Sequence, residues 1–360
     1  MMKTKLKNLL KELSERSTIN NQYEVLTSSQ NGIVSQTEYF NKQIASVQNI
    51  GYKIIRKGQF TYRSMSDTGL FFINRLTAPE IGIVSPAYPV FEIISDDLLP
   101  EYLELFFRST NFQHQISTES TGSTRLALKY NKLCDLEINV PSLCIQSEIV
   151  NNINVITNVI DLEKKQLKLY DELIKSRFIE MFGDVFYNDN RYNQVKIRDI
   201  VKYEQPTKYI VSSEEYNNSY ETPVLTAGKN FILGYTKEKN GIFIGSKEKV
   251  IIFDDFTCDS KIVNFDFKVK SSAIKILHMK KGVNIDFFYN VLKQHHYNVA
   301  NHKRHWISTF EIMKIGLPPL KLQNKYASFV EQIDKSKFIV QKRIDTYKEL
   351  LAKKMDEYFN

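Results

Sequence analysis

The sequence of 360 residues has few cysteines, little glycine or proline and no long apolar run. Its three cysteines, Cys134, Cys144 and Cys258, are too few and too scattered for a disulfide framework or a thiolate zinc site. Glycine (13 residues) and proline (9 residues) are too rare for a fibrous or low-complexity chain. No apolar stretch approaches the roughly 18 residues that span a membrane. We therefore expect a globular protein of the cytoplasm with no membrane partner.

The motifs of nucleotide-binding and methyl-transferring enzymes are also missing. Ala227-Gly-Lys-Asn230 lacks the first glycine and the hydroxyl ligand of a phosphate-binding loop. Leu317-Pro-Pro-Leu320 has the prolines of an amino-methyltransferase motif but neither its polar nor its aromatic end. We expect no catalytic residue in this chain.

A metal-dependent nuclease is a weak alternative, because Asp254, Asp255 and Asp266-Phe-Lys268 could supply its acidic residues and lysine. However, residues 263–269 alternate apolar and polar side chains, which predicts a strand with Asp266 and Lys268 on its solvated face. The histidines His295, His296, His302 and His305 lack the glutamate of a His-Glu-x-x-His zinc site. We expect no metal ligand.

The net charge is +8, and residues 186–320 contribute +6 of it (20 basic minus 14 acidic side chains). A basic second half suits a polyanionic partner such as nucleic acid. Charge alone does not decide between nucleic acid and a coding bias toward lysine.

The sequence contains an internal repeat whose two copies are separated by about half the chain. Pro141-Ser-Leu-Cys-Ile-Gln146 aligns with Pro318-Pro-Leu-Lys-Leu-Gln323, and the same offset pairs Tyr170 with Tyr347 and Phe182 with Phe359. Each copy is preceded by an alternating apolar run. A repeat of this length indicates two copies of one unit, each a globular part followed by a short strand, a proline and a long helix.

Each predicted long helix carries a heptad seam, with apolar residues recurring at steps of four and three. Glu163 interrupts the first seam and Lys337 the second. A helix of about 36 residues is a rod of roughly 54 Å, too long to be buried by one small domain, so we expect the two seams to pack on each other. The residues expected in this packing are Ile149, Ile153, Ile156, Ile160, Leu167, Tyr170, Val330, Ile333, Val340, Ile344, Tyr347 and Leu351.

The expected fold class is α+β, with two mixed α/β domains in tandem, each followed by a long helix whose seam packs on that of the other helix. Strands are predicted around a turn at Lys57-Gly58 and over 250–253, and short helices over 103–107 and 287–292. The expected segments are an N-terminal helix (1–16), a first domain (17–140), a central helix (141–185), a second domain (186–317) and a C-terminal helix (318–360).

Two loops in corresponding places of the repeat suit contacts with DNA. His302-Lys-Arg-His-Trp306 gathers cations beside the single tryptophan, and Gly122-Ser-Thr-Arg125 precedes the strand of the first copy. An arginine can donate two hydrogen bonds to one guanine, and lysine and serine can bind phosphate. The alternative is a surface loop whose tryptophan packs the domain against its helix. The DNA-contact candidates are Arg63, Ser123, Arg125, Lys229, His302, Lys303, Arg304 and His305.

Over nearly its whole length the chain resembles the specificity subunit of type I restriction-modification systems. The resemblance rests on Thr37–Ser46 and Ile83–Phe91 in the first domain, on Pro223–Tyr235 and Ile251–Thr257 in the second, and on the repeated Pro-x-x-x-x-Gln before each helix. Arg63-Ser64 departs from the Tyr-Asn-Pro that the first-domain class leads us to expect, which leaves the base preference of that domain open.

The resemblance implies that each domain is a target-recognition domain, which reads half of a split sequence in double-stranded DNA. It also implies that the two helices lie antiparallel as a coiled-coil spacer, which docks two methyltransferase subunits. It also implies restriction/translocase subunits as partners. No cofactor is expected in this chain; S-adenosylmethionine, ATP and Mg²⁺ belong to the partner subunits. The main alternative is a coiled-coil protein–protein scaffold without DNA recognition.

Overall fold

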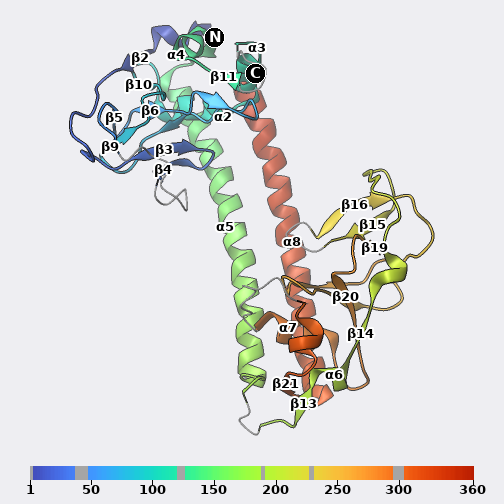
Figure 1. Ribbon diagram of the computed structural model, residues 1–360. Coiled ribbons are helices and arrows are strands. Elements are labelled where there is room, and N and C mark those ends of the chain that lie inside the picture. The colour runs from blue at the N-terminus through green and yellow to red at the C-terminus, as the bar shows by residue number, and fades with distance from the viewer. Residues whose placement is uncertain (1–2, 37–47, 120–125, 188–190, 227–230, 295–303) are drawn as a thin grey trace. The chain divides into compact units, whose positions relative to one another are not determined.

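The computed structural model describes residues 3–36, 48–119, 126–187, 191–226, 231–294 and 304–360 (Figure 1). The chain forms two compact units. Unit 1 comprises Met1–Lys164 and Lys342–Asn360, and unit 2 comprises Lys165–Gln341. Each unit therefore holds one globular domain and a part of both long helices.

The domain of unit 1 is built on a four-stranded antiparallel sheet. Its strands are β2 (Leu10–Leu13), β6 (Phe60–Thr61), β8 (Asn74–Arg75) and β10 (Val90–Ile93), in the order β2-β10-β6-β8. Helix α2 (Pro100–Arg108) packs on this sheet through Phe107, whose ring lies 6.1 Å from that of Phe60 and 6.3 Å from that of Phe91. Buried aromatic rings thus form the centre of this core.

Four two-stranded sheets and three short helices complete the domain of unit 1 in its described part. The strand pairs are β1 (Lys3–Lys5) with β12 (Glu137–Asn139), β3 (Leu26–Ser29) with β4 (Gly32–Ser35), β5 (Lys53–Arg56) with β9 (Ile81–Val84), and β7 (Met65–Ser66) with β11 (Leu126–Ala127). The helices are η1 (Leu6–Asn8), α3 (Thr110–Glu119) and α4 (Tyr130–Asp135).

The domain of unit 2 repeats this plan. Its four-stranded antiparallel sheet has the order β14-β20-β17-β18, from β14 (Val201–Glu204), β17 (Val250–Asp254), β18 (Ser260–Val263) and β20 (Ile274–Met279). Numbered along the chain, both sheets have the strand order 1-4-2-3. Helix α7 (Ile285–Gln294) takes the place of α2, and the pair β13 (Gln194–Lys196) with β21 (Lys314–Gly316) takes the place of β1 with β12. The duplication expected from the sequence is therefore present in the fold.

Unit 2 adds a second sheet, which has no equivalent of the same size in the described part of unit 1. Its strands are β15 (Thr222–Leu225), β16 (Ile232–Thr236) and β19 (Lys268–Val269), in the order β16-β15-β19. The remaining short helices are α6 (Ile197–Ile200), η2 (Pro206–Tyr209) and η3 (Trp306–Phe310).

The two long helices, α5 (Leu143–Phe182) and α8 (Leu320–Phe359), have 40 residues each. They run antiparallel in both units. In unit 1, Glu163 of α5 lies 2.9 Å from Arg343 of α8. In unit 2, Tyr326 of α8 donates a hydrogen bond of 3.3 Å to the carbonyl of Ile174 of α5. The expected fold class, with two mixed domains and an antiparallel pair of long helices, is confirmed.

The heptad seams lie on the inner side of both helices. Among the twelve residues named for this packing, none is exposed: Ile149, Ile153, Ile160, Val330, Val340 and Ile344 are buried, and the other six are half-buried. The polar interruptions are paired across the helices, because Glu163 contacts Arg343 within unit 1 and Lys337 contacts Asp171 within unit 2. Each charge therefore has an opposite charge on the facing helix.

A buried glutamine ties the start of each long helix to its domain in the same way. The Gln146 amide donates 2.7 Å hydrogen bonds to the carbonyls of Pro141 and Asp97 and accepts one of 2.8 Å from the backbone N–H of Leu99. Gln323 donates to the carbonyls of Pro318 (2.7 Å) and Gly282 (3.3 Å) and accepts from the N–H of Asn284 (2.8 Å). Both side chains are fully buried. The repeated Pro-x-x-x-x-Gln motif is thus a clamp between a long helix and the residues just before α2 or α7.

Two expectations about local structure are wrong. Residues 3–16 do not form the expected long helix: β1 pairs with β12, β2 pairs with β10 in the main sheet, and only the short turn η1 lies between them, so this segment is part of the first domain. Residues 263–269 are not one strand, because β18 ends at Val263 and β19 begins at Lys268 in a different sheet. In both cases the pairing partners are distant in sequence, and local periodicity does not reveal them.

Among the described residues, no helix is both long and apolar enough to cross a membrane.

Candidate nucleic-acid interface

Three of the eight DNA-contact candidates lie in the described part of the chain. Arg63 is exposed in unit 1, and Arg304 (exposed) and His305 (half-buried) belong to unit 2. Ser123, Arg125, Lys229, His302 and Lys303 lie outside the described residues. The structure therefore places one basic candidate on the first domain and two on the second.

The segment that carries Arg304 and His305 is held by a buried carboxylate. Asp255 accepts a hydrogen bond of 2.7 Å from the backbone N–H of Trp306 through Oδ1 and one of 2.9 Å from the N–H of His305 through its carbonyl. Its Oδ2 lies 3.3 Å from the ammonium of Lys275, and both side chains are 1% exposed. A buried ion pair with satisfied partners gives this turn a defined conformation.

Trp306 packs in the core of unit 2 and is not free to contact a ligand. Its ring lies 5.1 Å from that of Phe253 and 5.9 Å from that of Phe310, and it is 1% exposed. Beside it, the guanidinium of Arg304 lies 6.0 Å from the centre of the Phe256 ring. The tryptophan thus anchors the segment, while the neighbouring arginine remains accessible.

Arg63 has a comparable setting in unit 1. Its neighbour Tyr62 is buried and donates a hydrogen bond of 3.2 Å to the carbonyl of Leu128, and burial raises the pKa of this phenol. Ser64 donates to the carbonyl of Ala87 at 3.0 Å and accepts from the N–H of Leu128 at 2.9 Å through its carbonyl. The residues on both sides of Arg63 are therefore fixed, while its own side chain is exposed.

The carboxylates of the nuclease hypothesis do not converge. Asp254 accepts from Thr257 (2.7 Å) and from the N–H of Phe256 (2.9 Å), whereas Asp255 is paired with Lys275. Asp266 accepts from the N–H (3.0 Å) and the hydroxyl (2.6 Å) of Ser246, and these hydrogen bonds lower its pKa. Within the described ranges no group of three or more His, Cys, Asp or Glu side chains could hold a metal ion.

Lys268 does not lie on a solvated face, and that prediction is wrong. Its side chain is 3% exposed and lies 3.1 Å from Glu238, and its ammonium donates to the carbonyls of Asn240 (2.7 Å) and Gly241 (3.2 Å). Because the ammonium has three oxygen partners, its burial is compensated. Lys268 therefore fastens the segment before β17 to β19 and cannot serve as a nuclease lysine.

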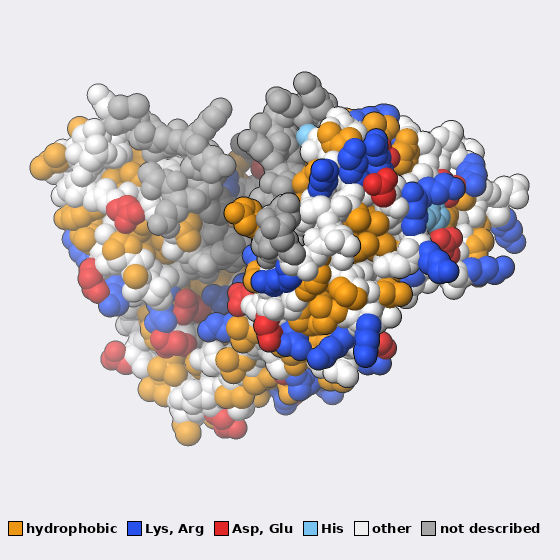
Figure 2. Space-filling view, turned by 90° about the horizontal axis from the view of Figure 1, so that it is seen from below, with side chains coloured by type: hydrophobic (Ala, Val, Ile, Leu, Met, Phe, Trp, Pro, Cys, Tyr) orange, Lys and Arg blue, Asp and Glu red, His pale blue; other side chains and the backbone are white. Residues whose placement is uncertain are grey.

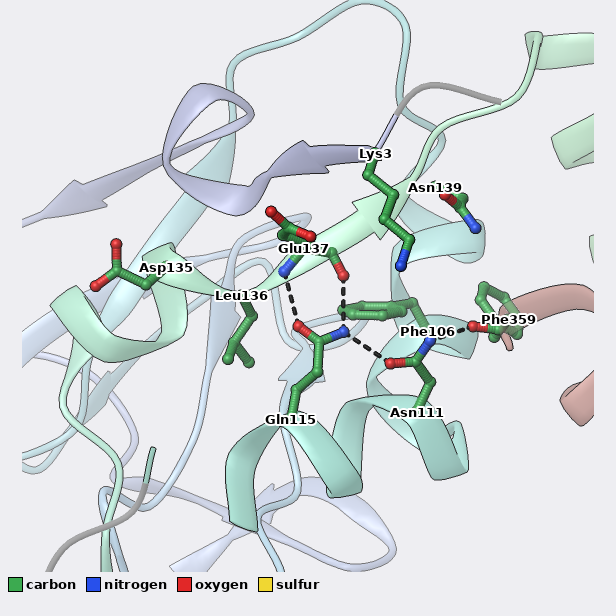
Figure 3. A pocket seen from close by; sticks show the side chains of 9 residues that line it. All are labelled: Lys3, Phe106, Asn111, Gln115, Asp135, Leu136, Glu137, Asn139 and Phe359. Carbon is green, nitrogen blue, oxygen red and sulfur yellow. Dashed lines mark hydrogen bonds between the residues drawn. The ribbon is translucent and has the colours of Figure 1, made fainter. Parts of the chain in front are cut away.

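The lining residues of a small cavity in unit 1 form hydrogen bonds with one another (Figure 3). Its volume is about 290 Å³. Gln115 donates to the carbonyl of Glu137 (2.9 Å) and to Asn111 (2.8 Å) and accepts from the N–H of Glu137 (2.8 Å), and Asn111 donates to the carbonyl of Phe359. These contacts join α3 to β12 and to the end of α8. The arrangement therefore ties these three elements of the fold together.

On the face seen in Figure 2, Lys and Arg side chains lie among hydrophobic and uncharged ones. Sequence reasoning singled out the basic segment before Trp306 but missed Asp255 as its anchor and Lys275 as the partner of Asp255. Asp255 follows β17, Lys275 stands on β20, and no motif links the two.

Comparisons with known proteins agree with this geometry. Residues 5–169 match the family model described as the type I restriction modification DNA specificity domain. The specificity subunit of the type I restriction enzyme EcoR124I/EcoR124II from Escherichia coli is 48% identical over 124 residues. That alignment spans 33% of this chain and 31% of the relative's length.

Two solved structures share the fold over almost the whole chain. One is the S subunit of the type I restriction-modification system from M. genitalium, with a TM-score of 0.58, 12% identity and coverage of 100% of this chain and 96% of that chain. The other is a structure that concerns complex assembly and conformational transition of the type I R-M system. It has a TM-score of 0.61 and 14% identity, and the match covers 99% of this chain and 97% of that chain.

The fold of the chain is the one seen in these two structures. Residues 5–169 carry the type I restriction modification DNA specificity domain. The resemblance of the chain to the specificity subunit of type I restriction-modification systems is confirmed.

Proposed function

We propose that this chain is the DNA-reading subunit of a type I restriction-modification complex, in which each domain reads one half of a split target. The observation that carries the proposal is the duplication: both domains have the strand order 1-4-2-3, and both are clamped to a long helix by a buried glutamine. The matched DNA specificity domain supplies the ligand class. Two equivalent readers in one chain suit a target with two separate halves.

The recognition chemistry rests on accessible cations presented by fixed backbone. Arg63 and Arg304 are exposed, while Tyr62 and Trp306 near them are buried and hydrogen-bonded. Arginine can donate two hydrogen bonds to O6 and N7 of guanine in the major groove, and such a contact discriminates best when the side chain is positioned in advance. His305 and the candidates outside the described residues complete the proposed contact set.

The long helices have the length that a split target requires. A helix of 40 residues is about 60 Å long, which exceeds the 34 to 36 Å of one turn of DNA. A spacer of this kind would allow two readers to reach successive major grooves, and its length would set the number of unread base pairs between the half-sites.

The proposed protein partners are two methyltransferase subunits and the restriction/translocase subunits. Support for a docking face comes from α5, where Val155, Leu162 and Leu169 are 62%, 64% and 61% exposed. They recur every seven residues, outside the seam that faces α8. Exposed apolar side chains at heptad spacing suit the packing of a further helix. S-adenosylmethionine, ATP and Mg²⁺ would act in the partners, and this chain would be non-catalytic.

Mapping methylated adenines across the genome, with and without this gene, tests the proposal. Loss of one split motif on deletion is the expected result. The rival hypothesis, a protein scaffold without DNA recognition, expects an unchanged methylation pattern. Retention of double-stranded DNA by the chain together with its methyltransferase, with an affinity that falls as salt rises, separates the two hypotheses in vitro.

A further inference from the structure

A lysine-rich cavity of about 760 Å³ lies in unit 2, lined by α7, β18 and the parts of α5 and α8 that belong to this unit. Its charged lining comprises three carboxylates and five lysines. Two of the carboxylates are already paired, Asp171 with Lys337 and Asp286 with Lys249. The third, Asp334, has a raised pKa because it is buried, although Lys337 opposes the rise.

Three lysines of this cavity have no carboxylate partner among the described residues: Lys175 of α5, Lys261 of β18 and Lys293 of α7. Lys261 and Lys293 are close enough to repel each other. Loss of hydration lowers the pKa of Lys293, the charge of Lys261 lowers it further, and Asp259 acts in the opposite direction. The three side chains are exposed, and an anion bound between them would relieve the repulsion between Lys261 and Lys293.

A neutral donor points to the same ligand class. The side-chain nitrogen of Gln294 is buried, lines this cavity and has no hydrogen-bond partner among the described residues. An amide N–H without a partner is costly, and a ligand oxygen would satisfy it. Cations and a free N–H donor together suit a phosphate group.

We propose that Lys175, Lys261, Lys293 and Gln294 bind phosphates of the DNA backbone. The identification of DNA as the source of the phosphate rests on the proposed function and on two neighbours of the site. The ammonium of Lys261 lies 4.5 Å from the centre of the Phe231 ring, two residues after the contact candidate Lys229. The turn that leads into β18 holds the contact candidate Arg304 through Phe256. Lys261 therefore lies beside Phe231, and the turn before β18 lies beside Arg304.

Lysine binds phosphate as a point charge and reads no base, so the site contributes affinity and register without changing the sequence recognised. The test compares the complex of this chain and its methyltransferase with the variant K175Q/K261Q/K293Q. Binding to a duplex that contains the target is measured over a range of salt concentrations. For three lost contacts the slope of log K against log salt should become shallower by about 2.7, since each contributes about 0.9.

A matched control removes the same charge elsewhere in unit 2. K239Q/K281Q/K321Q replaces three exposed lysines that do not line the cavity, and its slope should change much less. Thermal unfolding of both variants identifies any loss of folding. The methylated motif should be the same in all three proteins.

The proposal would be overturned if the slope of log K against log salt were the same for the folded cavity variant and for the control. It would also be overturned by loss of methyltransferase binding in the absence of DNA, because that result would assign the lysines to an acidic partner surface. If the unaltered complex shows no preference for any duplex, the proposed function itself fails. If the unaltered complex prefers its target duplex but the salt dependence of binding is unchanged in the cavity variant, only the proposed phosphate site is wrong.

Discussion

At the scale of single residues, two buried glutamines connect the domains to the long helices by hydrogen bonds. Gln146 and Gln323 occupy equivalent positions of the two copies and make the same three kinds of hydrogen bond. Glutamine is mostly exposed in proteins, so two fully buried copies indicate a specific role. That role is to fix the angle at which each domain meets its helix.

Gln146→Ala should lower the free energy of unfolding by about 2 to 4 kcal/mol, because it leaves the N–H of Leu99 and the carbonyls of Asp97 and Pro141 without their partner. Urea denaturation of the two variants Gln146→Ala and Glu148→Ala measures the effect, since Glu148 is exposed two residues further along the same helix. Equal stability of the two variants would show that the clamp contributes little.

Lys275→Met should destabilise the protein by about 3 to 5 kcal/mol, because it leaves the carboxylate of Asp255 buried without a charge partner. The double variant Lys275→Met/Asp255→Asn should regain part of this loss, because the unpaired charge is gone. Urea denaturation measures both. If the double variant is no more stable than the single one, the ion pair is not the cause.

Residue patterns predict part of this site and miss the rest for a physical reason. Trp306 is buried, as the packing alternative expects, and its ring lies beside Phe253 of β17 and Phe310 of η3. The alternating apolar and polar residues over 263–269 predict a solvated position for Lys268, because such a pattern assigns every charged side chain to the outer face of the strand. The burial of Lys268 depends on Glu238 and on two carbonyls of a distant loop, which no local pattern contains.

At the scale of elements, the long helices are the most predictable feature. Apolar residues recur with helical spacing along each helix of 40 residues, so every further turn supports the prediction of a helix. The helix predicted for the N-terminal segment is wrong. Leu6, Leu9 and Leu10 have the spacing of one face of a helix, and all three are buried, so the local pattern resembles that of a helix. The backbone of this segment instead pairs with β12 and β10, which are distant in the sequence. Strands of three or four residues carry too little pattern to outweigh such a spacing.

The outer stripe of α5 allows an element-scale prediction on assembly. Leu162→Lys should weaken co-purification with the methyltransferase at least tenfold, while the stability of the chain alone changes by no more than about 0.5 kcal/mol, as is usual for an exposed site. Asn154→Lys adds the same charge at an exposed position away from this stripe and is the control. Full assembly of the Leu162 variant would place the docking face elsewhere.

Helix length offers a second prediction at this scale. Inserting four residues after Gln166 adds about 6 Å to α5 and keeps its apolar stripe roughly in phase. Since one base pair is about 3.4 Å, the unread gap between the half-sites should grow by one or two base pairs, with both half-sites unchanged.

A two-residue deletion at the same place is the contrasting variant. It rotates the seam by about 200° and should abolish stable folding, because Leu167 and Tyr170 would then face water. Methylation mapping of the insertion variant gives the gap directly. An unchanged gap with full activity would mean that α5 does not set the spacing.

At the scale of the whole molecule, the central feature is a duplicated unit with divergent surfaces. The duplication could be predicted from sequence, since Pro, Gln, Tyr and Phe recur at one offset through both copies. The bases read could not, because recognition depends on where a few exposed side chains stand relative to a groove. The two domains share the clamp and the sheet order, and the loops around them differ.

The central claim is that each domain reads one half of the target independently. Its most direct test is the exchange of residues 186–317 for the second domain of another specificity subunit, followed by genome-wide mapping of methylated adenines in cells that express the chimera with the methyltransferase. The account predicts that one half of the split motif changes to that of the donor and that the other half and its methylated adenine stay the same. A change in both halves in a folded, active chimera would contradict it.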